Sequence, residues 1–544
     1  MCKRFVWSLV VSILMFCVLG GPALASPASP PPAQVGFSPL VLLTFLLPVG
    51  LILLSVAALS GNQAVSAATG AMVAWGLAVG VYFALGFAFQ FGGIAVVYDE
   101  PDLAGLYWEY SLLDVSWGTG WGMIGLRGFL MLGEASTPGA LGLFLSHLPF
   151  LGVATLIPFF AAWGRTRRWV ALLASLLMGS LIYPLVGNWT SGGGWLANLG
   201  RNLSLGHGFI DVGSAGLAVL TGAAAAWAAL LVLRVRFSRA VPQTKDTSDS
   251  AATTEVLSPT LVDSLDDPAP AEPLMVPMPP VHLPLLGWLG AALMAIGWMA
   301  TSSIAHLPTA TDVPLAAMAT GLVLAAFGGT LTASLYGWFT TRSPDVLMSA
   351  RGLAAGLVLA AAGAPFLPAW VMLAAGLLIG IMLPPLIYLF DRRLRINDSL
   401  GMLAAFGIPA LVGLLLPGLL ASGRYGVGWN GVGLDSFLGV EGQGVSGLWV
   451  MPGLTGDWPG QVAAQLIGIT AITVWSFGLS WFLVTSAKGL IHAWERSGLE
   501  FGSLPEPVGI ESGSPQPAQD ESLTGPMLQP QLDSEAPSVS ENEG

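Results

Sequence analysis

The sequence predicts an all-α polytopic membrane protein with eleven transmembrane helices, arranged as two halves of five helices and one final helix. Hydrophobic residues make up 54% of the 544 residues, charged residues make up only 9%, and the mean hydropathy is +0.74. Soluble domains carry about 25% charged residues, so the composition excludes a soluble fold. Apolar runs of about 20 residues follow one another along the chain, and each is long enough to cross a bilayer as a helix.

The segment 1–25 has the pattern of a secretory signal peptide. Lys3 and Arg4 precede an apolar stretch that ends in an A-x-A cleavage sequence at 23–25. The alternative is a first transmembrane helix that stays attached to the protein. Both cysteines of the chain lie in this segment, so its removal leaves no disulfide and no cysteine-ligated metal in the mature protein. A proline-rich linker follows at 26–38.

The eleven apolar runs predict the order of the helices. Five form a first repeat within 39–240, five form a second repeat within 282–421, and the last lies within 460–488. An odd number of spans per half inverts the second half relative to the first, and inverted repeats place a substrate path at their interface near the midplane. The predicted helices are 39–59, 67–91, 139–163, 169–187, 207–233, 283–305, 314–340, 349–365, 368–390, 400–420 and 461–485.

The basic residues predict which way the helices face. Of the 19 Lys and Arg, 14 fall on one predicted side, two lie in the signal segment, and three lie on the other side, at Arg127, Arg201 and Arg424. Positive charge marks the cytoplasmic side of a membrane protein. We therefore expect the mature N-terminus outside and the C-terminus in the cytoplasm, which a signal peptide followed by an odd number of spans also requires. The expected location is the bacterial inner membrane.

Four longer segments lie between or after the helices. The segments 241–281 and 489–544 are rich in Pro, Ser, Thr and acid and poor in aromatic residues, so we expect a disordered cytoplasmic loop and a largely disordered cytoplasmic tail. The segments 92–138 and 422–459 are rich in Gly, Trp and acid and are expected to be external loops. Much of the net charge of −12 lies in polar segments of this kind and does not indicate a nucleic-acid partner.

One acidic residue stands near the outer end of an apolar run. Asp211 lies in the stretch 206–233, which is otherwise apolar enough to span a bilayer. A carboxylate at membrane depth is costly and is therefore a candidate for a functional site. The alternative is a helix cap, in which the carboxylate accepts hydrogen bonds from the following backbone N–H groups, and one residue can fill both roles. Asp398, before the tenth helix, is most simply an acid placed at a helix N-terminus.

Six stretches of the chain carry a resemblance to one family. They are LIYPLVGNW from Leu181, GGGWLANLG from Gly192, GFIDVGSAGLAVLTG from Gly208, RGLAAGLVLAAAGAPFLP from Arg351, DRRLRINDSLGMLAAFG from Asp391, and GLEFGSLPEP from Gly498. In this order, and on the predicted helices, they resemble the ammonium transporter (Amt/Mep/Rh) family over about 39–499. The resemblance implies a trimer of eleven-helix protomers, each with its own narrow hydrophobic pore for ammonium or ammonia.

The resemblance also implies roles for single residues of the pore. The family's structural aspartate, which supports an external recruitment site, corresponds to Asp211. The family's two pore histidines correspond to Val219, eight residues after Asp211, and to Phe406 on the tenth helix. Neither side chain hydrogen-bonds or titrates, whereas an imidazole does both near neutral pH. An ammonium ion in this apolar bore faces a large desolvation cost, whereas neutral ammonia passes unless Phe406 plugs the bore.

The recruitment site of the family is altered as well. Its outer phenylalanine gate corresponds to Phe150, and its second gate phenylalanine falls at Thr301. Its recruiting tryptophan corresponds to Ser191, and Trp189 and Trp195 are close enough in sequence to replace it.

A histidine lies three residues before this outer gate. His147 is either a replacement histidine of the vestibule or a polar residue near a helix end without a chemical role.

Two functions are compatible with these replacements. The first is an ammonium or ammonia transporter or channel with an atypical hydrophobic pore, working as a homotrimer. The second is a transport-inactive relative that acts as an ammonium sensor or as the regulatory subunit of a mixed trimer, with the acidic cytoplasmic segments contacting a regulator. The sequence contains no catalytic cluster, metal-ligand pattern or nucleotide-binding glycine motif, so we expect neither an enzyme nor a bound cofactor or metal.

Overall fold

The computed structural model describes residues 38–114, 119–233, 282–301, 313–396 and 398–496. The predicted signal peptide, nearly all of the linker, the loop 241–281 and most of the tail lie outside the described residues. Within the described chain, ten helices are long and apolar enough to cross a membrane, and α13 (Val346–Ala361) is a shorter apolar helix. The predicted all-α, multi-pass membrane fold is therefore confirmed.

In the first half, the second and fourth spans each consist of two α-helices joined through a π-helical turn. Where α6 begins, Pro138 occupies the first turn and the Thr137 hydroxyl accepts the N–H of Ala140 at 3.2 Å, which caps the helix. The elements are η1 (Pro39–Phe45), α2 (Leu46–Val56), α3 (Gly61–Val81), η2 (Tyr82–Gly86), α4 (Phe87–Phe91), α6 (Pro138–Ala161), α7 (Arg168–Leu177), η7 (Met178–Ile182), α8 (Tyr183–Thr190), η8 (Ala215–Leu220) and α10 (Thr221–Val232).

In the second half, π-helical turns end the ninth span and begin the tenth, and the last helix follows. The carboxylate of Asp345 caps α13 by accepting the N–H of Met348 at 2.9 Å. The elements are α11 (His282–Ala300), α12 (Leu315–Thr341), α13, α14 (Ala369–Tyr388), η10 (Leu389–Arg393), η11 (Leu403–Gly407), α15 (Ile408–Leu420) and α16 (Gly460–Arg496). The last helix, α16, continues beyond the predicted end at 488.

Short elements organise the loops between the helices. Two hairpins occur, in which β1 (Glu109–Tyr110) pairs antiparallel with β2 (Ile124–Gly125), and β3 (Ser436–Phe437) pairs antiparallel with β4 (Val440–Glu441). The remaining elements are η3 (Ile94–Val96), η4 (Pro101–Leu103), η5 (Phe129–Met131), η6 (Gly133–Ala135), α9 (Leu199–Leu203) and η12 (Trp429–Gly431).

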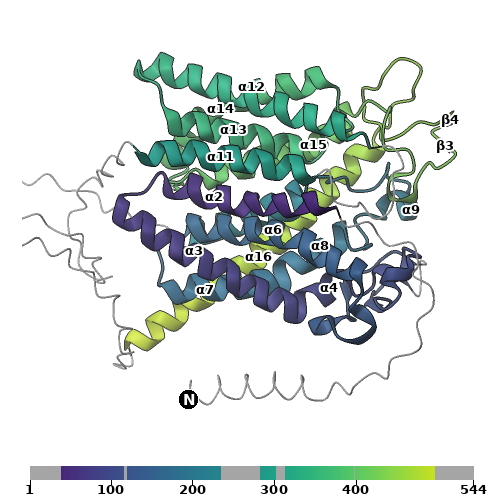
Figure 1. The fold of residues 1–544 in the computed structure, drawn as a ribbon, viewed down its shortest axis with the longest axis horizontal. Coiled ribbons are helices and arrows are strands. Elements are labelled where there is room, and N and C mark those ends of the chain that lie inside the picture. The colour runs from purple at the N-terminus through teal and green to yellow at the C-terminus, as the bar shows by residue number, and fades with distance from the viewer. Residues whose placement is uncertain (1–37, 115–118, 234–281, 302–312, 397, 497–544) are drawn as a thin grey trace, which may run out of the picture. The chain divides into compact units, whose positions relative to one another are not determined.

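Helices from the two halves pack directly on each other. Figure 1 shows α2 (purple) beside α11 (teal), and the two helices are in extensive contact. Where they cross, a Cβ on Gly50 or on Gly290 would overlap the carbonyl oxygen of the other residue. Small residues at such a crossing let two backbones approach without a side chain between them. The described residues up to Leu490 form one compact unit.

The fifth span begins eight residues later than predicted, at Ala215 rather than at 207. The backbone before it is not helical because other elements satisfy its hydrogen bonds. Gln461 of α16 makes one accepting and one donating bond, both of 2.8 Å, to the backbone of 207–208. Gln465, one turn later, makes two more to Ile210, at 2.8 and 3.0 Å. Irregular backbone among membrane helices is stable when it is buried in protein and paired in this way.

Candidate functional site

The carboxylate of Asp211 lies between this irregular segment and the start of the fifth span. Its Oδ2 accepts the N–H groups of Gly216 and Leu217, both at 2.9 Å, so the side chain caps the first turn of η8. Its Oδ1 is buried without a hydrogen-bond partner. The same carboxylate therefore satisfies the helix N-terminus and keeps one oxygen for another donor.

Asp398 is placed in the same way before the tenth span. Its two oxygens accept the N–H groups of the three residues 402–404, at distances of 2.7 to 3.2 Å. The third residue after each aspartate has a positive φ, which is 58° at Ser214 and 73° at Gly401. The two segments that lead into η8 and η11 are therefore built alike, although their sequences differ.

Val219 and Phe406 occupy corresponding places in these two segments. Each follows its capping aspartate by eight residues, and each lies in a π-helical turn, η8 or η11. The two turns pack against each other, and the side chains of Val219 and Phe406 are 0% and 1% exposed. The structure thus brings the elements that carry the two predicted pore positions together, with both apolar side chains buried. Irregular π-turns of this kind occur often at functional sites.

Phe150 and His147 lie together on α6. Their ring centroids are 6.2 Å apart in an edge-on arrangement, and both side chains are buried. The ring of His147 also meets Phe91 edge-on at 4.8 Å. Its Nδ1 lies 2.9 Å from the carbonyl oxygen of Leu143 and 3.1 Å from the hydroxyl oxygen of Ser146. The predicted vestibule histidine is therefore beside the predicted gate phenylalanine, held in a defined orientation.

Thr301 follows the end of α11 and is fully buried. Its hydroxyl donates to the carbonyl oxygen of Trp298 at 2.7 Å. The indole Nε1 of Trp298 in turn donates to the carbonyl oxygen of Gly213 at 3.1 Å. The sixth span is thereby tied to the segment that carries Asp211, and Thr301 lies one hydrogen bond away from this tie.

Ser191 and the two neighbouring tryptophans face different partners. The Ser191 hydroxyl donates to the Gly187 carbonyl oxygen at 3.0 Å and accepts from a buried glutamine of α4 at 3.2 Å. Trp189 and Trp195 instead line an open groove of about 760 Å³ along α16, where the ring of Trp189 lies 5.5 Å from that of Trp475. The indole of Trp189 donates to the carbonyl oxygen of Met123 at 2.9 Å. Trp189 thus contacts the last helix and Trp195 lines the same groove, whereas Ser191 is held by α4.

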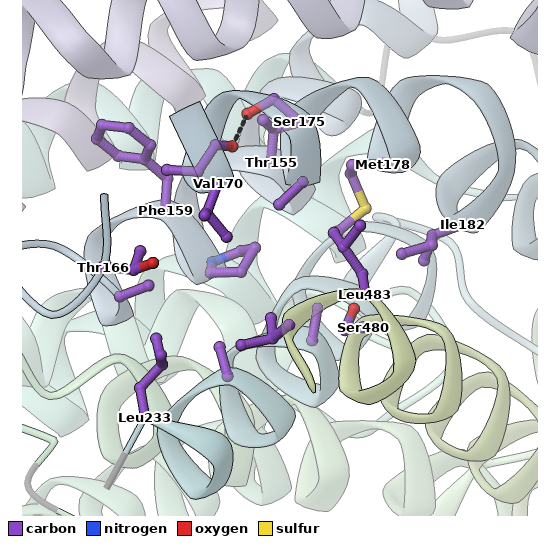
Figure 2. Close-up of a pocket in the computed structure, with 17 residues that line it drawn as sticks. Thr155, Phe159, Thr166, Val170, Ser175, Met178, Ile182, Leu233, Ser480 and Leu483 are labelled. Atoms are coloured by element: carbon purple, nitrogen blue, oxygen red, sulfur yellow. Dashed lines mark hydrogen bonds between the residues drawn. The ribbon is translucent and has the colours of Figure 1, made fainter. Parts of the chain in front are cut away.

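A separate small cavity is also lined in part by α16. Figure 2 shows it among α6, α7, α10 and α16, with Thr166, Leu233 and Ser480 among its lining residues, and its volume is about 40 Å³. None of the predicted site residues lines this cavity. Within the described ranges, no group of three or more His, Cys, Asp or Glu is arranged to hold a metal ion.

Three amide side chains with structural roles were not predicted from the sequence. Gln461 and Gln465 hold the irregular segment before η8, and Gln90 of α4 is the glutamine that bonds to Ser191. All three are fully buried in spans that are otherwise apolar. A polar side chain inside an apolar span needs a partner. The presence of a glutamine in such a span is therefore the sequence feature that could have identified these positions.

The comparisons with known proteins agree with this architecture. A sequence model described as the Ammonium Transporter Family matches residues 37–257 and 278–495. An ammonium transporter, Amt2, from Archaeoglobus fulgidus is 26% identical over 377 residues, which cover 69% of this chain and 70% of the relative. A putative ammonium transporter from Synechocystis is 25% identical over 409 residues, covering 74% of this chain and 71% of the relative.

Solved structures share the fold. A protein titled Sensor Amt Protein has a TM-score of 0.59 and 18% identity, and the alignment covers 86% of this chain and 96% of that one. The Mep2 protein of Saccharomyces cerevisiae has a TM-score of 0.56 and 19% identity, with 83% and 86% covered. The family model spans most of the chain on both sides of the loop 258–277. The chain is therefore a multi-pass membrane protein that belongs to the ammonium transporter family, and not an enzyme.

Proposed function

We propose that this chain transports ammonium, as ammonia, along a path between its two halves. The observation that carries the proposal is the pair of alike segments, each capped by an aspartate, whose π-turns η8 and η11 pack on each other. The path enters beside Asp211, Phe150 and Thr301 and continues past Val219 and Phe406. An arrangement of this kind is what an inverted repeat of five spans would produce at its interface.

The apolar pair in the path selects the neutral form. Val219 and Phe406 offer no hydrogen bond, and moving an unpaired cation into such surroundings costs several kcal/mol or more. A cation at the mouth instead meets the buried Oδ1 of Asp211. It also meets the faces of aromatic rings, and each such cation–π contact contributes about 0.5–2 kcal/mol. The ion gives up its proton to the external water on the side of entry, and ammonia passes through the apolar stretch.

A second candidate function is a transport-inactive sensor or regulatory subunit. The observation that favours it is the full burial of Val219 and Phe406 at the contact of the two halves. A structural neighbour is titled Sensor Amt Protein, which shows that the fold occurs in a sensor. In this role, ammonium at the mouth would change contacts at the cytoplasmic side, where a regulator binds.

The assembly proposed with either function is a trimer in the bacterial inner membrane. The N-terminus faces outward and the C-terminus faces the cytoplasm, as the distribution of Lys and Arg favours. The trimer is a homotrimer for a transporter and a mixed trimer for a regulatory subunit.

Uptake of methylammonium and ammonium into proteoliposomes tests both candidates. The variants are Asp211→Ala and the double variant Val219→His/Phe406→His. The matched control is Val323→His/Phe327→His, which makes the same changes on the exposed face of α12. Saturable wild-type uptake that Asp211→Ala abolishes supports transport. Uptake that appears only in Val219→His/Phe406→His means that the pore of the natural protein is closed, which favours the second function. No uptake by any variant contradicts transport.

A further inference from the structure

The side chain of Gln90 lies at the end of α4, fully buried between α4 and α8. Its Oε1 accepts the hydroxyl of Tyr82 at 2.8 Å, and its Nε2 donates to the hydroxyl of Ser191 at 3.2 Å. Its backbone carbonyl accepts the side-chain N–H of Asn188 at 3.0 Å. One glutamine therefore links Tyr82 of its own span, the second, to Asn188 and Ser191 at the end of α8.

The neighbouring backbone is shaped around this side chain. A Cβ at Gly187 would overlap the carboxamide of Gln90, and a Cβ at Gly192 would overlap the backbone carbonyl oxygen of Gln90. The two glycines thus let α8 approach Gln90 closely enough for the bond to Ser191. A packing role alone would not require that the amide reach this hydroxyl.

The hydrogen bonds that Ser191 makes leave one lone pair of its hydroxyl for a substrate. A hydroxyl has one donor and two acceptor lone pairs. The Ser191 donor is used by the carbonyl oxygen of Gly187 at 3.0 Å, and one lone pair is used by Gln90. The side chain is only partly buried, so the second lone pair is available as an acceptor. An acceptor of fixed direction suits a ligand that carries N–H donors, such as ammonium.

We infer that Gln90 is a positioning residue, which orients the Ser191 hydroxyl as a hydrogen-bond acceptor for the N–H groups of the incoming cation. The inference rests on the proposed function and takes Ser191, which corresponds to the family's recruiting tryptophan, to lie at the mouth of the path. Gln90 acts on the substrate only through Ser191. Its loss weakens binding and leaves the later passage of ammonia past Val219 and Phe406 unchanged.

The first test is a double-mutant cycle on methylammonium uptake by the full chain in proteoliposomes. We expect Gln90→Leu to raise the KM about 5- to 10-fold with a nearly unchanged maximal rate. In a Ser191→Ala background the same change has no further effect, because the two residues act as one unit. Gln443→Leu is the matched control, since it removes another fully buried glutamine whose bonds are confined to the loop 422–459. An equal rise of the KM with and without Ser191 overturns the inference.

The second test measures the position of residue 191 without transport. Cys2 and Cys17 are the only cysteines of the chain, so Ser191→Cys in a Cys2→Ser/Cys17→Ser background is a single reporter. We expect Gln90→Leu to accelerate its reaction with a methanethiosulfonate reagent several-fold, while Gln443→Leu leaves the rate unchanged. An unchanged rate in Gln90→Leu, with the protein still eluting as a folded species, overturns the inference. An accelerated rate in a protein that takes up no ammonium leaves the role of Gln90 in place and contradicts the proposed function.

Discussion

The carboxylate of Glu109 is a buried acid without a partner. It lies in the hairpin of the loop between α4 and α6, and both of its oxygens are buried and make no hydrogen bond. Burial, and to a smaller extent the charge of Asp114, raises the pKa of Glu109 from 4.5 to about 8. The folded protein therefore holds a proton that the unfolded chain releases between these two values. The stabilising contribution of the protonated acid is fully present below about pH 4.5 and is lost as the pH rises through about 8.

This linkage predicts how stability changes with pH. We expect the wild-type protein in detergent to unfold at a lower temperature at about pH 8 than at about pH 5. Glu109→Gln, which keeps a neutral polar group of the same size, is expected to show a smaller difference. Asp435→Asn serves as the control, since it neutralises an exposed acid of the other long loop. Parallel pH curves for the wild type and Glu109→Gln would contradict the expected role of the buried carboxyl.

Residue positions differ in how far the sequence alone could predict them. The spacing of eight residues from an aspartate to Val219 and to Phe406 is visible in the sequence, and the structure places both in equivalent turns. The directions of Trp189 and Trp195 were not visible. Trp189 packs on Trp475 of α16, which lies far along the chain, and a local pattern carries no information about such a partner.

At the scale of the element, the entry to η11 depends on one left-handed residue. Gly401 has a φ of 73°, and the nearest atoms to a Cβ at this position would be those of Arg351 at 3.6 Å, an ordinary contact. The space therefore allows a side chain, but the backbone conformation disfavours one by roughly 1 kcal/mol. We expect Gly401→Ala to destabilise the protein by about that amount in denaturant unfolding.

Ser214, the corresponding residue of the first half, allows a substitution with the opposite expected effect on stability. Ser214 follows Asp211 by three residues, as Gly401 follows Asp398, and has a φ of 58°. Ser214→Gly therefore relieves the backbone strain and should stabilise the protein slightly. If both substitutions shift stability in the same direction, the φ values are not what determines it.

The helix boundaries are less well predicted by the sequence than the positions of the membrane spans. Hydropathy placed the spans, but the fifth begins at Ala215 because Gln461 and Gln465 bind the backbone before it. An apolar run therefore marks a membrane segment without marking how much of it is helical. The irregular part is the one that carries Asp211, so the least predictable backbone lies at the candidate site.

At the scale of the whole molecule, the spans follow from composition because a bilayer demands long apolar helices with internally paired backbones. Ten of the described helices meet this demand, and α13, most of whose residues are buried in protein, is shorter. The side of the membrane that each end faces depends instead on where the positive charges lie, which packing does not reveal.

The charge distribution predicts an orientation that a labelling experiment can read. Fourteen of the 19 Lys and Arg lie on one predicted side, and moving them across a membrane is unfavourable. Ser436 in the loop before α16 and Ser343 between α12 and α13 are both exposed and lie on opposite predicted sides. In a Cys2→Ser/Cys17→Ser background, Ser436→Cys should react with an impermeant maleimide on intact spheroplasts, whereas Ser343→Cys should react only after permeabilisation. The reverse result would place the C-terminus outside, and any regulator contacting the tail would then have to be extracytoplasmic.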